Sequence, residues 1–144
     1  MSSRSPSTIA KGVGIGAVVA IIANAIIFFI GKAGAPTQVI QKTGDAPVDL
    51  GLGNVIGASI ISIVVGGIAY LIVTKIRPNG FTLWASIAGI VAVFSIFGPL
   101  NMKIDTASKI ALAAMHIATV ISAIFGHAFF LRDRSGKAGA ERKV

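Results

Sequence analysis

Long apolar runs separated by short polar stretches make up most of this chain. Four such runs lie at residues 12–30, 52–73, 81–97 and 107–131, and no Asp, Glu, Arg or Lys occurs within them away from their ends. Each is close to the roughly 20 residues that a helix needs to cross a hydrocarbon core about 30 Å thick. Backbone groups in lipid must be hydrogen-bonded internally, so these runs predict helices rather than the many short strands of a barrel. The pattern predicts an all-α fold, a four-helix transmembrane bundle.

The bundle is expected to be a single domain over residues 1–131, followed by a tail at residues 132–144. The tail is basic and contains glycine, which predicts disorder. Residues 31–51 form the longest connection, which is rich in Gly and Pro and has no clear periodicity. Asp49 and Asp105 precede the second and fourth runs, where each is expected to cap its helix and to interact with the positive helix end.

The first apolar run has an alternative interpretation as a signal peptide. Residues 33–35 read Ala-Gly-Ala, which resembles a cleavage site after an apolar run that follows Arg4 and Lys11. However, the run is longer than the apolar part of a typical signal peptide, and Pro36 would follow the cut. We therefore expect an uncleaved first span.

Composition supports a membrane protein and excludes an ordinary soluble domain. Hydrophobic residues make up 54% of the chain and charged residues only 12%, whereas a soluble domain has about 25% charged residues. The net charge of +8 would suggest a nucleic-acid partner in a soluble protein. Here the charges lie between and beyond the apolar runs, so the expected partner is the lipid bilayer and not nucleic acid. The chain contains no Cys, so thiolate catalysis and thiolate metal ligands are excluded.

The distribution of Lys and Arg predicts the orientation. One side of the membrane would hold nine of these residues and the other side four. The nine are Arg4, Lys11, Lys75, Arg77, Arg132, Arg134, Lys137, Arg142 and Lys143, and the four are Lys32, Lys42, Lys103 and Lys109. The positive-inside rule places both termini of this multi-pass protein in the cytoplasm.

Small residues recur at every fourth position of the predicted helices and predict helix contacts. Small side chains allow close approach of two helices in lipid, where no hydrophobic effect drives their association. The expected packing positions are Gly12, Gly16, Ala20, Ala58, Ser62, Gly66 and Gly89. The same stripes could instead face another copy of the chain or another membrane subunit.

The polar residues inside the apolar runs offer little for catalysis. No carboxylate lies within them, and no motif identifies a nucleophile, so we expect no catalytic residue. The two histidines, His116 and His127, are eleven residues apart, which places them on one helix face but about 16 Å apart along the axis. That separation prevents shared metal coordination within one chain, so no metal site is predicted. The sequence does not identify a cofactor.

His116 has two interpretations. A neutral imidazole could be hydrogen-bonded across the bundle to Asn24, Asn54 or a serine. Alternatively, an ionisable group inside the membrane is a candidate for ligand binding or for sensing protons. The candidate ligand-binding residues are His116, Asn24, Asn54 and Thr119. His127 lies near the cytoplasmic end, where we expect it to anchor the helix at the lipid headgroups.

Two stretches carry a family resemblance. The segments FGPL at 97–100 and ALAAMHIATVISAI at 111–124, with the order of the four runs, resemble a group of small bacterial four-helix membrane proteins classed as a domain of unknown function. The resemblance covers most of residues 11–131. It implies the same fold and a bacterial membrane location, with Pro99, Met115 and His116 as the positions typical of the group. It implies no activity.

These observations favour a small membrane protein that acts through helix packing, as a homo-oligomer or as an accessory subunit of a membrane complex. The alternative is binding or transport of a small lipophile, cofactor or ion in a bundle cavity near His116. An enzyme acting on lipid-like substrates is a third interpretation, and the absence of catalytic groups in the apolar runs disfavours it.

Overall fold

The structure is a computed structural model of the 144-residue chain. It describes residues 6–35, 39–40, 48–77 and 80–141, and in residues 39–40 and 130–141 it describes the backbone only.

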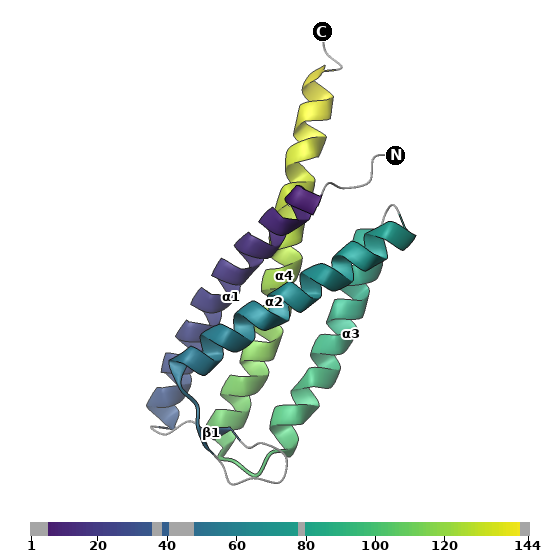
Figure 1. Cartoon of the computed structure of the whole chain (residues 1–144). Helices are drawn as coiled ribbons and strands as arrows, with labels where there is room; N and C mark the ends of the chain where they lie inside the picture. Colours follow the sequence, from purple (N-terminus) through teal and green to yellow (C-terminus); the bar gives the residue numbers. More distant parts are fainter. Residues whose placement is uncertain (1–5, 36–38, 41–47, 78–79, 142–144) are drawn as a thin grey trace.

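Four helices form an antiparallel bundle, which confirms the predicted fold class. They are α1 (Pro6–Gly34), α2 (Leu52–Ile76), α3 (Gly80–Asn101) and α4 (Thr106–Glu141). Each contains a segment long and apolar enough to cross a membrane, and in α4 this segment is Thr106–Phe129. The start of α1 and the end of α4 lie at the same end of the bundle (Figure 1).

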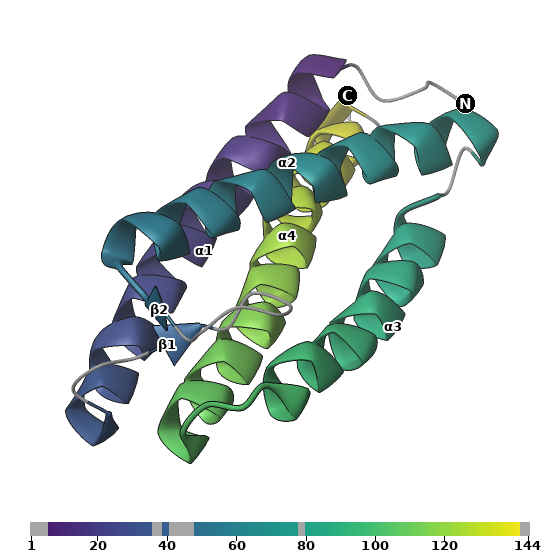
Figure 2. The same ribbon diagram turned by 60° about the horizontal axis from the view of Figure 1, so that its bottom comes forward.

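The four helices do not pack equally. α1 and α4 lie along each other and form the most extensive helix contact. α2 crosses this pair obliquely, so that it begins beside α1 and ends beside the start of α3 (Figures 1 and 2). α3 packs along α4 and meets α2 mainly near the turn that joins them. The bundle therefore has one tight side, between α1 and α4, and one more open side, between α2 and α3.

The two predicted helix caps have different outcomes. The backbone N–H of Ser108 donates to Oδ1 of Asp105 at 2.8 Å, which confirms Asp105 as the cap of α4. The hydroxyl of Ser108, followed by its backbone N–H, lowers the pKa of the exposed Asp105 carboxyl by stabilising its ionised form. The prediction for Asp49 is wrong, because the N-cap of α2 is Gly51 and no side chain caps that helix.

Two polar segments are more regular than the sequence predicted. In the long connection, the two-residue strands β1 (Val39–Ile40) and β2 (Val48–Asp49) pair antiparallel, with Val39 opposite Asp49 (Figure 2). At the other end of the bundle, α4 continues to Glu141, so the tail expected to be disordered from residue 132 is helical over 132–141. The remaining tail positions, 142–144, lie outside the described residues.

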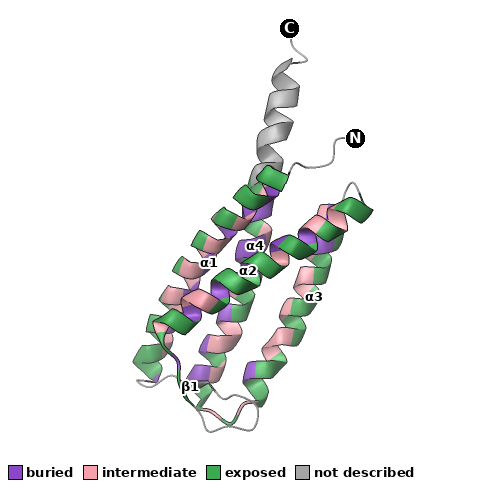
Figure 3. Cartoon of the chain, in the orientation of Figure 1, coloured by how far each residue is buried: buried purple, intermediate pink, exposed green. Residues whose placement is uncertain are grey.

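The interior contains two apolar clusters, one toward each end of the bundle. The first consists of Ile9, Ala20, Ile63, Tyr70, Trp84 and Ala123, and the second of Phe28, Leu50, Val55, Ala111 and Met115. Many large apolar side chains are exposed instead, and that of Phe94 is 69% exposed. Exposed positions recur along the helices (Figure 3). Such an outer surface is suited to lipid and not to water. The chain is a multi-pass membrane protein.

Candidate functional site

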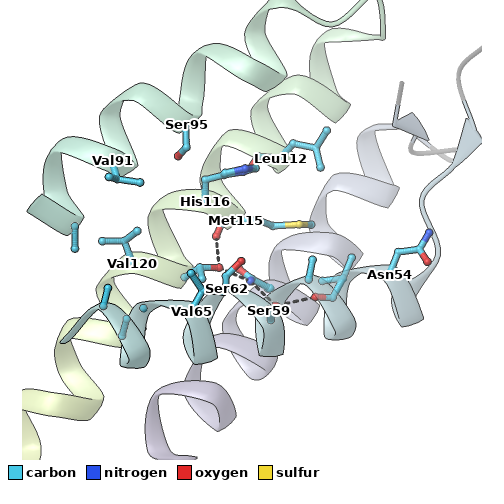
Figure 4. A pocket seen from close by; sticks show the side chains of 18 of the residues that line it. Asn54, Ser59, Ser62, Val65, Val91, Ser95, Leu112, Met115, His116 and Val120 are labelled. Atoms are coloured by element: carbon cyan, nitrogen blue, oxygen red, sulfur yellow. Dashed lines mark hydrogen bonds between the residues drawn. The ribbon is translucent and has the colours of Figure 1, made fainter. Parts of the chain in front are cut away.

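A cavity of about 660 Å³ lies on the open side of the bundle, between α2, α3 and α4 (Figure 4). Two-thirds of its lining residues are apolar, and none of them is charged. Its polar lining residues are Asn24, Asn54, Ser59, Ser62, Ser95, His116 and Thr119. A concave, mainly apolar site of this size with a few polar groups is typical of sites for small molecules.

The cavity exists because a stripe of small residues on α2 faces open space. Ala58, Ser62 and Gly66 line the cavity at a spacing of four residues. The residues of α2 that are buried against the other helices follow one position later in the sequence, at Val55, Ser59, Ile63 and Gly67. A Cβ atom added at Gly66 would meet no atom within 4 Å outside its own helix, and the same holds for Gly89 of α3. Four expected packing positions, Ala58, Ser62, Gly66 and Gly89, therefore lie outside the tight helix contacts.

The expected packing residues of α1 are differently placed. Gly12, Gly16 and Ala20 are buried and form the face of α1 that meets α4. A Cβ atom at Gly12 would lie 2.6 Å from Nδ1 of His127, and one at Gly16 would lie 3.1 Å from the carbonyl oxygen of Ser122. The two helices approach so closely at this seam only because these positions lack side chains.

A hydrogen-bond network joins three helices at the wall of the cavity. Nδ2 of Asn24 donates to Oγ of Ser59 and to Oγ1 of Thr119, each at 2.8 Å. The two hydroxyls donate in turn to backbone carbonyls four residues earlier on their own helices, at Val55 (2.7 Å) and Met115 (2.8 Å). Asn24 thus links α1 to α2 and to α4 at a depth where lipid surrounds the bundle, and such bonds stabilise helix association.

This network determines which way the Asn24 amide points. Each hydroxyl has one proton, and both protons are used on the carbonyls of their own helices. The hydroxyl oxygens can therefore only accept from Asn24, so the NH2 group must face them both. The amide oxygen, Oδ1, is buried and has no hydrogen-bond partner among the described residues. Asn24 is 3% exposed, and its Oδ1 is enclosed by the surrounding helices.

His116 borders the same cavity from α4 (Figure 4). Its Nδ1 lies 2.7 Å from the carbonyl oxygen of Leu112. A carbonyl can only accept, so Nδ1 carries the proton, and Nε2 of a neutral imidazole is then an acceptor. The expected bond to Asn24, Asn54 or a serine is not formed. The ring donates instead to the carbonyl oxygen of Leu112, four residues earlier on α4. The ring is exposed rather than enclosed.

The prediction of a headgroup anchor is wrong for His127. This residue is only 4% exposed and packs between aromatic rings, with ring centroids 4.4 Å from Tyr70 and 5.0 Å from Trp84. α2 and α3 converge near their connecting turn (Figure 1), and Tyr70 and Trp84 from these helices cover His127, whereas His116 lies farther along α4 at the cavity. The two histidines differ in burial because the neighbouring helices cross α4 at an angle.

The aromatic cluster around His127 was not predicted from the sequence. Tyr70 and Trp84 have ring centroids 5.1 Å apart, and Nε1 of Trp84 donates to the carbonyl oxygen of Gly66 at 3.0 Å. The two aromatic residues lie at similar distances before and after the turn between α2 and α3, which is the signal that could have paired them. Ser59 was not predicted either, since nothing in its sequence position identifies it as the partner of Asn24.

All four candidate ligand-binding residues, His116, Asn24, Asn54 and Thr119, line this one cavity. Among the described residues, no group of three or more His, Asp or Glu side chains is placed to hold a metal ion. The lining combines a large apolar surface with a few polar side chains, among them Asn54, Ser62 and His116. This arrangement can enclose a neutral, mainly apolar molecule and hold it by few hydrogen bonds.

Comparison with known proteins gives one match. Residues 4–132 match a family of unknown function, DUF6069. Neither the curated proteins nor the solved structures contain a match to the chain.

Proposed function

The chain belongs to a family of unknown function, DUF6069, and from its geometry we propose that it binds a small, mainly apolar molecule within the membrane. The observation that carries this proposal is the cavity of about 660 Å³ between α2, α3 and α4. Sites for small molecules have volumes of about 300–1,000 Å³ and combine an apolar lining with few polar groups. The open side of the bundle would admit such a molecule from the lipid.

The proposal includes a location and an orientation. The protein resides in the bacterial inner membrane with both termini in the cytoplasm. Nine Lys and Arg residues on the side of the termini, against four on the other side, support this orientation. The cavity then lies nearer the outer end of α2, because its lining residues run from Asn54 to Ala69 of a helix that ends at Ile76.

The proposal is tested by placing a larger side chain in the cavity and identifying the small molecule that the variant no longer retains. Val91 lines the cavity, whereas Val93, two residues later on α3, does not. Both are similarly exposed, at 56% and 59%, so Val91→Trp and Val93→Trp form a matched pair. The wild type and both variants are purified in nanodiscs of native lipid, and the small molecules retained by each are compared by mass spectrometry.

We expect one molecule to be enriched with the wild type and with Val93→Trp, and to be depleted about fivefold or more with Val91→Trp, because the indole occupies part of the cavity and obstructs the molecule. Equal molecular content in all three samples would contradict the proposal. Folding of each variant is checked by circular dichroism, so that loss of the molecule is not confused with loss of structure.

A second candidate function is assembly, either as a homo-oligomer or as an accessory subunit of a membrane complex. It is favoured by the small residues of α2 that the bundle leaves uncovered: Gly53 and Ala58 are exposed, and a Cβ atom at Gly57 would meet nothing within 4 Å outside its own helix. Such a surface allows another helix to approach closely.

Native mass spectrometry of Gly57→Leu tests this second function. Gly14→Leu on α1 is the control, because a Cβ atom at Gly14 also meets nothing within 4 Å. Assembly through α2 predicts a higher mass for the wild type and for Gly14→Leu, and dissociation of Gly57→Leu. A wild-type protein of monomer mass with no associated subunit would exclude it.

A further inference from the structure

The two halves of the cavity differ in polarity. We propose that the cavity takes an amphiphilic lipid, whose apolar chain lies in the half nearer the chain termini and whose polar head lies in the half nearer the opposite end of the bundle. This inference rests on the proposed function, because it names the class of molecule, and its orientation, for the same cavity.

On α2 the lining changes from mixed to apolar along the helix. α2 runs from the end opposite the termini toward the end that carries them (Figure 1). Its polar lining residues are Asn54, Ser59 and Ser62. The lining residues that follow are Val65, Gly66 and Ala69, none of which has a polar side chain.

α3 shows the same order in the opposite chain direction. It runs away from the termini (Figure 1), and its lining residues are Trp84, Ile87, Ala88, Val91 and Ser95. Ser95, which lies farthest from the termini, is polar. The one polar atom of the Trp84 side chain, Nε1, donates to the carbonyl oxygen of Gly66 at 3.0 Å, so the hydrogen bond of the indole is already made within the protein.

α4 agrees with both. It runs toward the termini, and its polar lining residues, His116 and Thr119, precede the apolar Val120 and Ala123. Three helices therefore place polar side chains in one half of the cavity and only apolar ones in the other. Contact with an apolar lining favours a hydrocarbon chain, whereas a polar head in that half would lose its hydrogen bonds with water without replacement.

An aromatic wall closes the apolar half. Trp84 is the lining residue of α3 nearest the termini, and it is 3% exposed. Its ring centroid lies 5.1 Å from that of Tyr70 and 5.0 Å from that of His127, and neither of these two residues lines the cavity. The end of an apolar chain in this half would therefore meet the indole of Trp84.

The side of the cavity offers an entry from lipid. Val65 of α2 and Val91 of α3 both line the cavity, and both are more than half exposed. A lipid of the leaflet opposite the termini already has its head on that side and its chain toward the bilayer centre. Such a lipid could enter between α2 and α3 without reversing its orientation. The polar half offers amide, hydroxyl and imidazole groups, which include donors and acceptors, so the lining determines where the head lies and not its identity.

The test locates the two ends of a bound amphiphile. The full chain in nanodiscs is titrated with 1-O-(12-bromododecyl)glycerol, which carries bromine at the chain end, and with 1-O-(3-bromododecyl)glycerol, which carries it near the head. Trp84 is the only tryptophan of the chain and lines the apolar half, so bromine in contact with it quenches the fluorescence. The part of the quenching that unbrominated 1-O-dodecylglycerol displaces measures bound probe, as distinct from probe dissolved in the lipid.

We expect displaceable quenching by the chain-end probe to exceed that by the head probe about threefold or more, because Ser95 in the polar half lies about 16 Å along α3 from Trp84. The opposite order is expected of probe dissolved in the leaflet on the side of the termini, where the head is nearer Trp84.

Gly66→Leu and Gly89→Leu form a matched pair for the location of the chain. A Cβ atom added at either position would meet nothing within 4 Å, but of the two only Gly66 lines the cavity. We expect Gly66→Leu to weaken displaceable binding about fivefold or more, because its side chain occupies part of the apolar half, and Gly89→Leu to leave binding unchanged. Circular dichroism checks the folding of both variants, and if Gly66→Leu does not fold, the two probes with the wild type still decide the orientation.

Three results would contradict these ideas in different ways. Equal displaceable quenching by the two probes, or stronger quenching by the head probe, overturns the orientation and leaves the proposed binding function standing. Binding that is equal in Gly66→Leu and Gly89→Leu places the chain outside the apolar half and also overturns the inference. The absence of displaceable quenching by either probe counts against the binding function itself, and the inference fails with it.

Discussion

The two sides of the bundle use similar residues with opposite results. Along the seam between α1 and α4, Gly12, Gly16 and Gly126 bring two backbones together, and a Cβ atom at Gly126 would collide with the carbonyl oxygen of Gly12. On the side between α2 and α3, a Cβ atom added at Gly66 or Gly89 would meet nothing within 4 Å. A small residue permits close approach but does not cause it. Where α1 and α4 lie along each other, the space between the helices is closed. Where α2 crosses obliquely, space remains between the helices as a cavity.

The polar residues show the same contrast. On the tight side, Asn24 is buried and donates both N–H groups of its amide to hydroxyls from two other helices. Asn54 on α2 is exposed at the cavity. One asparagine stabilises the bundle, while the other can change without disturbing helix contacts. Three matched comparisons test this difference, beginning with the largest expected effect.

The largest effect is expected for Gly126→Ala. Its new methyl group would overlap the carbonyl oxygen of Gly12 and lie 2.6 Å from the backbone nitrogen of Gly16, and neither backbone can move unless the helices separate. We expect a loss of about 3 kcal/mol in the free energy of unfolding, near the upper end of overpacking effects. Unfolding in mixed micelles with increasing SDS, followed by circular dichroism, measures this change.

The matched control is Gly89→Ala on the open side. Its methyl group meets nothing within 4 Å, and Ala is a better helix former than Gly, so stability should be unchanged or rise by about 0.5–1 kcal/mol. Equal losses in the two variants would show that the open side is packed as tightly as the seam.

A smaller effect is expected for Asn24→Leu. This change removes two hydrogen bonds across the bundle, and bonds between membrane helices contribute about 0.6 kcal/mol each on average and at most about 1.7 kcal/mol. We expect a loss of about 1–2 kcal/mol in the same unfolding measurement. Asn54→Leu is the control and should change stability by less than about 0.5 kcal/mol, as for an exposed position. A larger loss from Asn54→Leu would reverse the assignment of the two residues.

The smallest effect is expected at the first turns of α2 and α4, which lie at the end of the bundle opposite the chain termini. α4 is capped by Asp105, whereas no side chain caps α2. Hydrogen bonds from Ser108 hold the pKa of Asp105 below its ordinary value of 3.8. A lowered pKa means that the ionised cap stabilises the folded state fully above about pH 3.8, and that this contribution is lost as the pH falls through the lowered pKa.

Amide hydrogen exchange of the first turn of α4 measures the cap. Protection of residues 106–109, corrected for the intrinsic exchange rate, should be lower in Asp105→Ala than in the wild type at pH 6. The difference should shrink as the pH falls through the lowered pKa of Asp105. Asp49→Ala should leave protection at the start of α2 unchanged, because Asp49 lies in β2 and does not cap that helix. Protection that does not depend on Asp105 would remove its role as a cap.

The prediction from sequence succeeded for features that depend on a single helix. The length of the apolar runs and the lack of internal charge identify four membrane helices, because any polar backbone group in lipid must be bonded within its own helix. The cap at Asp105 is likewise local, since donor and acceptor are three residues apart.

The prediction was weaker where the face of a helix had to be chosen. In a soluble helix the apolar side faces the core, but in a membrane helix both lipid and core favour apolar residues, so the periodic signal is nearly absent. On α2 two adjacent stripes were available. The small one at Ala58, Ser62 and Gly66 lines the cavity, and the one that includes Ser59 and Ile63 is buried. On α1 the small stripe and the buried stripe coincide.

The sequence by itself determined the class of this protein, its four helices, and the polar residues on which a function could depend. It also showed that Asn24, Asn54, His116 and Thr119 lie within or next to apolar segments. Only the tertiary structure decided that Asn24 bonds to Ser59 and Thr119, and that His127 is buried while His116 borders a cavity. The physical reason is the crossing of the helices: their angles set which faces meet, and those angles result from packing among four helices at once.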